Sequence, residues 1–290
     1  MKKWIFLISL MLTFAAHADD CDNQNICQWN CAKTSNDSCT ATLDKTSKTL
    51  TVSGTGQMAD YNDILNDTGN FIGVDTPWYN YKNSIQSLIV DEGITTLGAR
   101  AFKDIRQISN VNLPDGLQKI GPGAFNTIFA LNTIDIPDSV TEIGVGAFAD
   151  CRNLKNIQLS ENLTTIDYMA FANTGIIDLV LPESVTSISP GLVRGGIDYW
   201  EQAKILNLYC GETISAQCEK ALKWKKDLGI NVQVISYQKT PNGQIFYNNK
   251  WYNNANDILS GNYAKKRIYT VEEAAKVSKD TRNTLKIRYK

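Results

Sequence analysis

An interval of 23 residues recurs along the middle of the chain and constrains its fold more than any other feature. Four phenylalanines, each preceded by alanine, keep this interval: Phe102, Phe125, Phe148 and Phe171. Two aliphatic columns keep it as well: Val90, Leu113, Ile136 and Leu159, and Leu97, Ile120, Ile143 and Ile166. A fifth copy is one residue shorter and has Leu192 where the next phenylalanine is due. A period of this length predicts stacked units, each of which buries its apolar side against its neighbours.

The copy at 132–154 predicts how one unit folds. Ile134 and Ile136 alternate with polar residues, which is typical of a strand with one buried face. Pro137 ends that strand because it has no amide hydrogen to donate. A second extended segment runs from Val140 to Ile143, and a short helical turn follows at 147–151. Equivalent strands of successive copies would pair at about 4.7 Å. We therefore expect a solenoid with two parallel β ribbons, short helical turns and a file of phenylalanine rings inside.

The unit at 136–154 reads Ile-Pro-Asp-Ser-Val-Thr-Glu-Ile-Gly-Val-Gly-Ala-Phe-Ala-Asp-Cys-Arg-Asn-Leu. It resembles the BspA-type leucine-rich repeat of bacterial surface antigens. The segment before the repeats is similar to the lead-in of that family, with Leu50-Thr-Val-Ser-Gly-Thr-Gly-Gln-Met58 and Pro77-Trp78-Tyr79. The resemblance covers about residues 40–195. It implies a secreted or surface-displayed solenoid used for adhesion and protein contacts.

The pattern divides the chain into five expected segments. They are a signal peptide at 1–18, a cysteine-containing start with a cap at 19–82, the repeats at 83–197, a second cap at 198–239 and a basic tail at 240–290. Open solenoids need capped ends because the end units otherwise expose apolar surface and strand edges. In the first cap, the aromatic tract at 77–81 fits either packing over the first coil or a glycan-binding platform.

The second cap and the tail have their own predicted elements. We expect a strand at 205–209, a helix at 215–228 and a strand at 232–237. Asn248-Asn249 lies between two short apolar runs and predicts a hairpin. A strand at 267–269, a helix at 270–279 and a last strand at 284–289 would complete a small α+β module. Residues 265–290 hold nine basic and three acidic side chains, so this tail is locally cationic.

The N-terminus predicts export. Lys2 and Lys3 precede an apolar run and the sequence Ala16-His17-Ala18, which is typical of a cleaved secretory signal. The mature protein would then be secreted, periplasmic or at the cell surface. No later apolar stretch is long enough to span a bilayer. Removing the two lysines from 29 basic residues leaves 27 against 30 acidic ones, a balance that favours neither nucleic acid nor an anionic membrane.

Signal cleavage would also remove His17, the only histidine. Its loss excludes Ser-His-Asp and Cys-His catalysis and histidine metal ligands, and we expect no cofactor. Of the seven cysteines, six are candidates for disulfides: Cys21, Cys27, Cys31, Cys39, Cys210 and Cys218. The first four allow three pairings, and a zinc site is the alternative, although their spacing does not form two CxxC pairs. Cys151 remains, and we interpret it as a buried free thiol.

The outward positions of the first ribbon form the candidate binding face. They are Asn110, Asn112, Thr133, Asp135, Asn156, Gln158 and Asp178, followed by Val180. These side chains are small and mostly uncharged, without the aromatic and arginine anchors of high-affinity interfaces. We therefore expect weak, multivalent contact with a protein or a surface polymer. The sequence leaves the identity of that partner and the oligomeric state open.

Three functions follow from these patterns. The first is a non-catalytic, exported module for protein contact or adhesion. The second is a structural envelope protein held in place by its C-terminal module. The third, from another class, is a hydrolase that uses paired carboxylates. The acidic residues are scattered without a repeated pairing, and Cys151 has no histidine to activate it. The first function is therefore the expectation.

Overall fold

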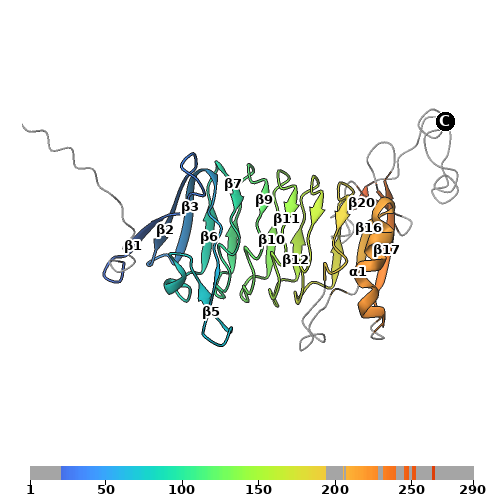
Figure 1. Ribbon diagram of the computed structural model, residues 1–290. Helices are drawn as coiled ribbons and strands as arrows, with labels where there is room; N and C mark the ends of the chain where they lie inside the picture. The colour runs from blue at the N-terminus through green and yellow to red at the C-terminus, as the bar shows by residue number, and fades with distance from the viewer. Residues whose placement is uncertain are drawn as a thin grey trace, which may run out of the picture.

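The computed structural model describes residues 21–193, 205, 207–227, 231–239, 245–247, 250–252 and 263–264. Within them the chain forms a row of coils that follow one another along a single axis, with helix α1 at the far end (Figure 1). The expected signal peptide, and the elements expected at 267–269, 270–279 and 284–289, lie outside the described residues.

The first strands join the start of the chain to the repeats. β1 (Ile26–Asn30), β2 (Ser38–Asp44) and β3 (Thr49–Gln57) pair antiparallel. The first half of β3 pairs in parallel with β6 (Ser87–Val90), and its end pairs with β7 (Ile94–Leu97). One strand therefore begins both ribbons. A small hairpin of β4 (Asp63–Leu65) and β5 (Phe71–Val74), and a 3-10 turn η2 (Tyr79–Tyr81), lie between β3 and β6.

The second ribbon is continuous. It runs from β7 through β9 (Lys119–Ile120), β11 (Glu142–Ile143) and β13 (Thr165–Ile166) to β15 (Ser187–Ile188), always in parallel. Paired residues are 23 apart until the last step, where Ile166 pairs with Ile188, 22 residues later. The 23-residue period of the sequence therefore sets which residues pair between neighbouring strands of this ribbon. The inward aliphatic residue of each strand is buried.

The first ribbon is interrupted, whereas the period predicts a continuous one. Its strands are β6, β8 (Asn110–Asn112), β10 (Thr133–Asp135), β12 (Asn156–Gln158) and β14 (Asp178–Val180). Among the described strands, β8 does not pair with β10, nor β12 with β14. At the first gap, a hydrogen bond joins the loops that precede β8 and β10, where Ala130 N donates to Arg106 O at 2.9 Å. The second gap coincides with the shortened copy, where Gly175 brings its backbone close to that of the preceding loop.

Four phenylalanine rings form one stacked file inside the coils. The centroids of Phe102, Phe125, Phe148 and Phe171 are 5.6, 5.3 and 5.7 Å apart, and every ring is buried. Trp78 extends the file at 6.2 Å from Phe102 and donates its indole hydrogen to Ala101 O. Because Trp78 is fully buried, its role is packing, and a glycan platform that uses this ring is wrong.

The last described elements follow the repeats on one sheet. β16 (Asn207–Gly211) and β17 (Gln233–Lys239) continue from β14 in parallel, and η4 (Glu212–Ile214) and α1 (Ser215–Asp227) connect them. The bounds of β16, α1 and β17 each lie within about two residues of those predicted from the sequence. β18 (Ile245–Tyr247), β19 (Lys250–Tyr252) and β20 (Tyr263–Ala264) then pair antiparallel. Tyr247 pairs with Lys250, as expected for a hairpin that turns at Asn248-Asn249.

All six candidate disulfide cysteines are paired. The bonds are Cys21–Cys27, Cys31–Cys39 and Cys210–Cys218, so the zinc alternative for the first four is wrong. Cys151 is a buried free thiol whose sulfur donates to Phe125 O, and burial raises its pKa to about 12. In the described part of the chain, none of the helices is both long and apolar enough to cross a bilayer.

Candidate binding face

The side chains of the first ribbon that were expected to face outward mostly do so. Asn110, Asn112, Thr133, Asp135, Asn156 and Gln158 are exposed. Between them, Ile134 is buried, and Val111 and Ile157 are partly buried. Thr133 pairs with Asn156, and Asp135 pairs with Gln158, so the outward side chains form two files across the strands. We call these six residues the polar face.

The polar face ends before β14. Asp178 is half-buried, and its Oδ1 accepts a hydrogen bond from Asn207 Nδ2 at 2.6 Å. Val180 was expected to be exposed, but its exposed fraction is only 3%. The reason is that β14 is followed by β16 and not by another repeat, so Tyr209 pairs beside Val180. The three strands before β14, which are β8, β10 and β12, therefore carry the candidate face.

An aromatic and arginine ladder flanks this face, which sequence reasoning missed. Arg106, Phe129 and Arg152 occupy the same repeat position, four residues before β8, β10 and β12. The guanidinium carbons of Arg106 and Arg152 lie 5.1 and 5.4 Å from the centroid of the Phe129 ring. The sequence analysis found no aromatic or arginine anchors on the candidate face. That conclusion holds for the strands and is wrong for the loops beside them. The 23-residue spacing of the three residues was the signal that could have found them.

A buried carboxylate holds one end of the ladder. Asp104 has a 2% exposed side chain, and it accepts hydrogen bonds from Tyr79 Oη at 2.7 Å and Lys82 Nζ at 2.6 Å. Arg106 Nε donates to its second oxygen at 2.5 Å. Burial alone would raise the pKa of Asp104, but Lys82, Tyr79 and Arg106 outweigh that effect and hold the pKa below its ordinary value. Arg106 is thus anchored while half of its side chain stays exposed.

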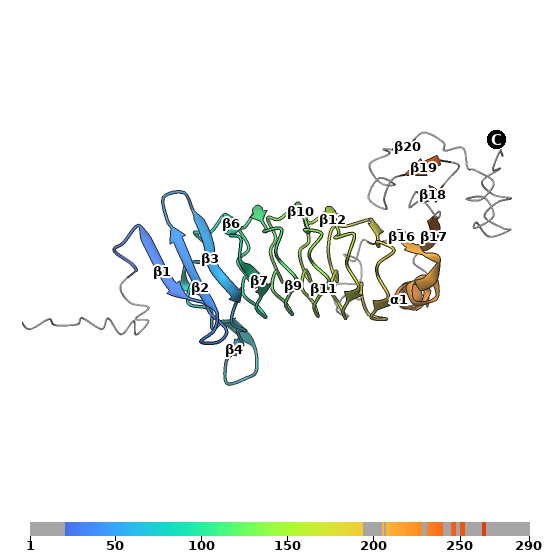
Figure 2. The same cartoon turned by 90° about the horizontal axis from the view of Figure 1, so that it is seen from above.

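Exposed apolar residues gather elsewhere, on the side of the second ribbon. Ile64, Leu65, Phe71 and Ile72 are 40–57% exposed on the β4–β5 hairpin, which projects from that side (Figure 2). Asn66 Oδ1 orders the hairpin tip by accepting hydrogen bonds from the amides of Thr68 and Asn70. This hairpin has no counterpart in the repeat period, so the repeat pattern did not point to it. The polar face and the apolar hairpin are therefore separate surfaces.

Parallel coils of 22 or 23 residues with buried aliphatic and aromatic files define a leucine-rich repeat protein. Residues 75–194 match the family model for the BspA type leucine rich repeat region, in six copies. The repeat region of this chain is therefore similar to the repeats of that family. Six copies are one more than the period of the phenylalanines predicts. The match begins just before Trp78, whose ring continues the file in place of a phenylalanine.

Solved structures similar to this chain are bacterial leucine-rich repeat proteins. One from Eubacterium ventriosum is 17% identical to this chain, with a TM-score of 0.40. The aligned region covers 79% of this chain and 48% of the other protein. A leucine rich cell surface protein from Faecalibacterium prausnitzii is 19% identical, with a TM-score of 0.35, and the aligned region covers 63% of this chain and 54% of that protein. This chain spans about half the length of these two proteins. A comparison with curated protein sequences found no match.

Proposed function

We propose that this protein is an exported, non-catalytic scaffold that contacts a protein or a surface polymer through its polar face. The observation that carries the proposal is the regular exposure of that face on three successive coils, with the Arg106–Phe129–Arg152 ladder along its border. Arginine and aromatic side chains are the residue types that most often dominate binding energy. The ladder would therefore supply the anchor, and the polar face would supply the complementary surface.

The rigidity of the coils supports recognition by this face. The file of stacked rings and the hydrogen bonds between coils hold successive coils together, and β10 pairs with β12 within the polar face. Binding then costs little ordering of the backbone, and the short side chains of Asn and Thr lose little rotamer freedom. Each contact is nevertheless weak, so affinity would come from several coils that bind one extended ligand together.

The disulfides support export. Three of them lie in the described residues, and disulfides persist in oxidising compartments outside the cytosol. Localisation is tested by fractionating cells and digesting intact cells with a protease. Export predicts that the protein appears in the medium, in the periplasm or in the protease-sensitive surface fraction. Recovery in the cytosol alone, with reduced cysteines, would contradict it.

Binding is tested with two matched variants of one coil. Gln158→Lys adds a positive charge to the polar face, and Thr164→Lys adds the same charge to an exposed position near the second ribbon. Purified proteins are measured for retention on immobilised host matrix proteins and on envelope fractions. We expect Gln158→Lys to weaken retention about tenfold or more, because the charge disrupts a packed polar contact. Equal retention of the two variants would refute the assignment of this face.

The envelope-protein alternative depends on the C-terminal tail. Deleting residues 240–290 and repeating the fractionation separates the two functions. A scaffold that binds through its polar face keeps its matrix affinity without the tail. A structural envelope protein would instead move from the cell fraction into the medium.

A further inference from the structure

The strand β1 ends the ten-stranded sheet at its N-terminal side, and β2 is its sole partner among the described residues (Figure 2). Lys45 N donates to Asn25 O and Cys31 N donates to Cys39 O, both at 2.9 Å. These bonds fix which residues of β1 face β2, because backbone groups alternate in direction along an antiparallel pair. The amide and carbonyl groups of Ile26, Gln28 and Asn30 therefore point away from β2, along the outer edge.

This edge lacks the features by which proteins usually prevent strand pairing. Edge strands are commonly protected by lysine, proline, inward-pointing charges or a bulge. β1 has the sequence Ile-Cys-Gln-Trp-Asn, with neither charge nor proline, and its register with β2 is unbroken over five residues. Ile26 is 46% exposed, and Gln28 and Asn30 are exposed as well. The edge can therefore accept another strand.

β1 is also held rigidly in place. The disulfides Cys21–Cys27 and Cys31–Cys39 fix the chain at both ends of the strand. Between them the ring of Trp29 packs against Trp78 at 6.3 Å and Tyr81 at 5.7 Å. A strand that pairs with a preorganised edge does not have to order it, which removes one of the main entropic costs of binding.

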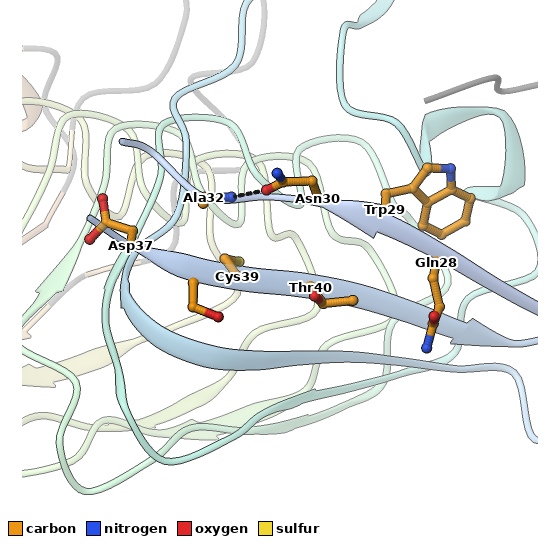
Figure 3. Close-up of a pocket in the computed structure, with 8 residues that line it drawn as sticks. Gln28, Trp29, Asn30, Ala32, Asp37, Cys39 and Thr40 are labelled. Carbon is orange, nitrogen blue, oxygen red and sulfur yellow. Dashed lines mark hydrogen bonds between the residues drawn. The ribbon is translucent and has the colours of Figure 1, made fainter. Parts of the chain in front are cut away.

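A cavity of about 400 Å³ lies beside β1 and β2 (Figure 3). Gln28, Thr40 and Asp37 contribute polar side chains to its lining. Asn30 Oδ1 accepts a hydrogen bond from Ala32 N at 2.9 Å, which shapes the end of the edge. Trp29 also lines the cavity, and it lies with Cys27 on the buried face of β1. Successive side chains of a strand added here would therefore lie alternately beside the polar residues and beside the apolar residues of β1.

We propose that the outer edge of β1 binds an extended peptide segment of a partner protein by β-strand addition, as an additional strand of the ten-stranded sheet. This mode of recognition uses backbone hydrogen bonds for affinity and alternate side chains for specificity. A flexible segment fits better than a second copy of this chain. Five residues of edge give a strand about 17 Å long, and a stable complex between folded proteins usually buries about 1,200–2,000 Å². The site differs from the polar face in position and in chemistry.

The first test measures amide exchange in the purified, oxidised protein by NMR. The amides of Gln28 and Asn30 should exchange rapidly in the free protein, while those of Cys27 and Trp29 are protected by β2. The probe is a capped peptide of alternating threonine and valine with a lysine at each end, and its control has proline in place of the central valine. We expect the probe, and not the control, to slow exchange at Gln28 and Asn30. Protection of these amides without any peptide, or no change with it, overturns the proposal.

The second test uses two substitutions at one residue. Gln28→Pro removes an outward amide and leaves the backbone hydrogen bonds to β2, which edge strands tolerate. Gln28→Ala removes the side chain and keeps the amide. Both substitutions remove the hydrogen bond that Gln28 Nε2 donates to Thr42 Oγ1 at 3.3 Å, so the comparison isolates the amide. Gln28→Pro should weaken binding of the probe about tenfold, and Gln28→Ala should leave it within about twofold. Equal affinity of a folded Gln28→Pro variant overturns the proposal, as does a dimer through β1 in sedimentation. If Gln28→Pro does not fold, the exchange measurement on the unaltered protein decides.

Discussion

Replacing Phe148 by alanine tests the packing on which the repeat stack depends. The ring is fully buried and lies nearly parallel to Phe125 at 5.3 Å and to Phe171 at 5.7 Å. Burial of the side chain contributes about 1.5–3 kcal/mol, and each ring pair adds about 0.5–1.5 kcal/mol. Phe125 N donates to Ala147 O and Phe148 N donates to Ala170 O, so hydrogen bonds hold the coils apart and the cavity cannot close. We expect Phe148→Ala to lower the free energy of unfolding by about 3–5 kcal/mol.

The assay is urea unfolding followed by circular dichroism, with the slope of the transition checked for each protein. The matched control is Phe148→Leu, because the fifth copy also has an aliphatic side chain at this position. Phe171 N donates to Leu192 O as Phe148 N donates to Ala170 O, so the buried Val193, and not Leu192 as the sequence predicted, takes the place of the ring. Leucine fills much of the volume, so the control should lose roughly 1–1.5 kcal/mol. A loss below about 1 kcal/mol for Phe148→Ala would refute the packing argument. If the two variants lose equal free energy of unfolding, the claim that the cavity adds to the cost of Phe148→Ala is refuted.

Three further predictions concern the titrating and bonded groups. The Cys151 thiol should not react with a disulfide reagent at pH 8 until urea unfolds the protein, since burial raises its pKa to about 12; reaction in the native state contradicts its burial. Replacing Cys210 and Cys218 by serine should cost about 2–3 kcal/mol in urea, because the bond closes a short loop, and an unchanged midpoint argues against that bond. Asp104→Asn should cost about 1–3 kcal/mol at pH 7. The pKa of Asp104 is lowered in the folded state, so its stabilisation is full above the unfolded pKa and is lost as the pH falls through the folded value. The difference from the unaltered protein should therefore shrink in melts below about pH 4, and a constant difference contradicts the ion pairing.

Periodicity predicted the parts of the fold that repeat. The file of rings, the buried aliphatic columns and the register of the second ribbon all follow from residues that recur every 23 positions. Where the repeat changes, the same reasoning fails. The gap between β12 and β14 coincides with a single missing residue, and Val180 is buried because β16 follows β14. Those outcomes depend on which element comes next in space, which a period does not encode.

Disulfide pairing shows a second limit of the same kind. Four cysteines at Cys21, Cys27, Cys31 and Cys39 allow three pairings, and their spacing favours none. The choice was made by β1 and β2, whose antiparallel register places Cys31 beside Cys39. Cys21 and Cys27 then remain and pair with each other. Tertiary register decided a question that local sequence left open.

The two proposed surfaces differ in what the sequence could reveal about them. The polar face and its ladder consist of side chains at fixed repeat positions, so even Arg106, Phe129 and Arg152 could be found by counting residues. The edge of β1 consists of backbone groups, which every residue carries and no pattern marks. Its availability depends on β1 being the last strand of the sheet and on two disulfides that hold it. If both proposals hold, the periodic side chains bind a surface and the non-periodic end binds a flexible peptide, so Gln158→Lys should weaken only the first activity and Gln28→Pro only the second.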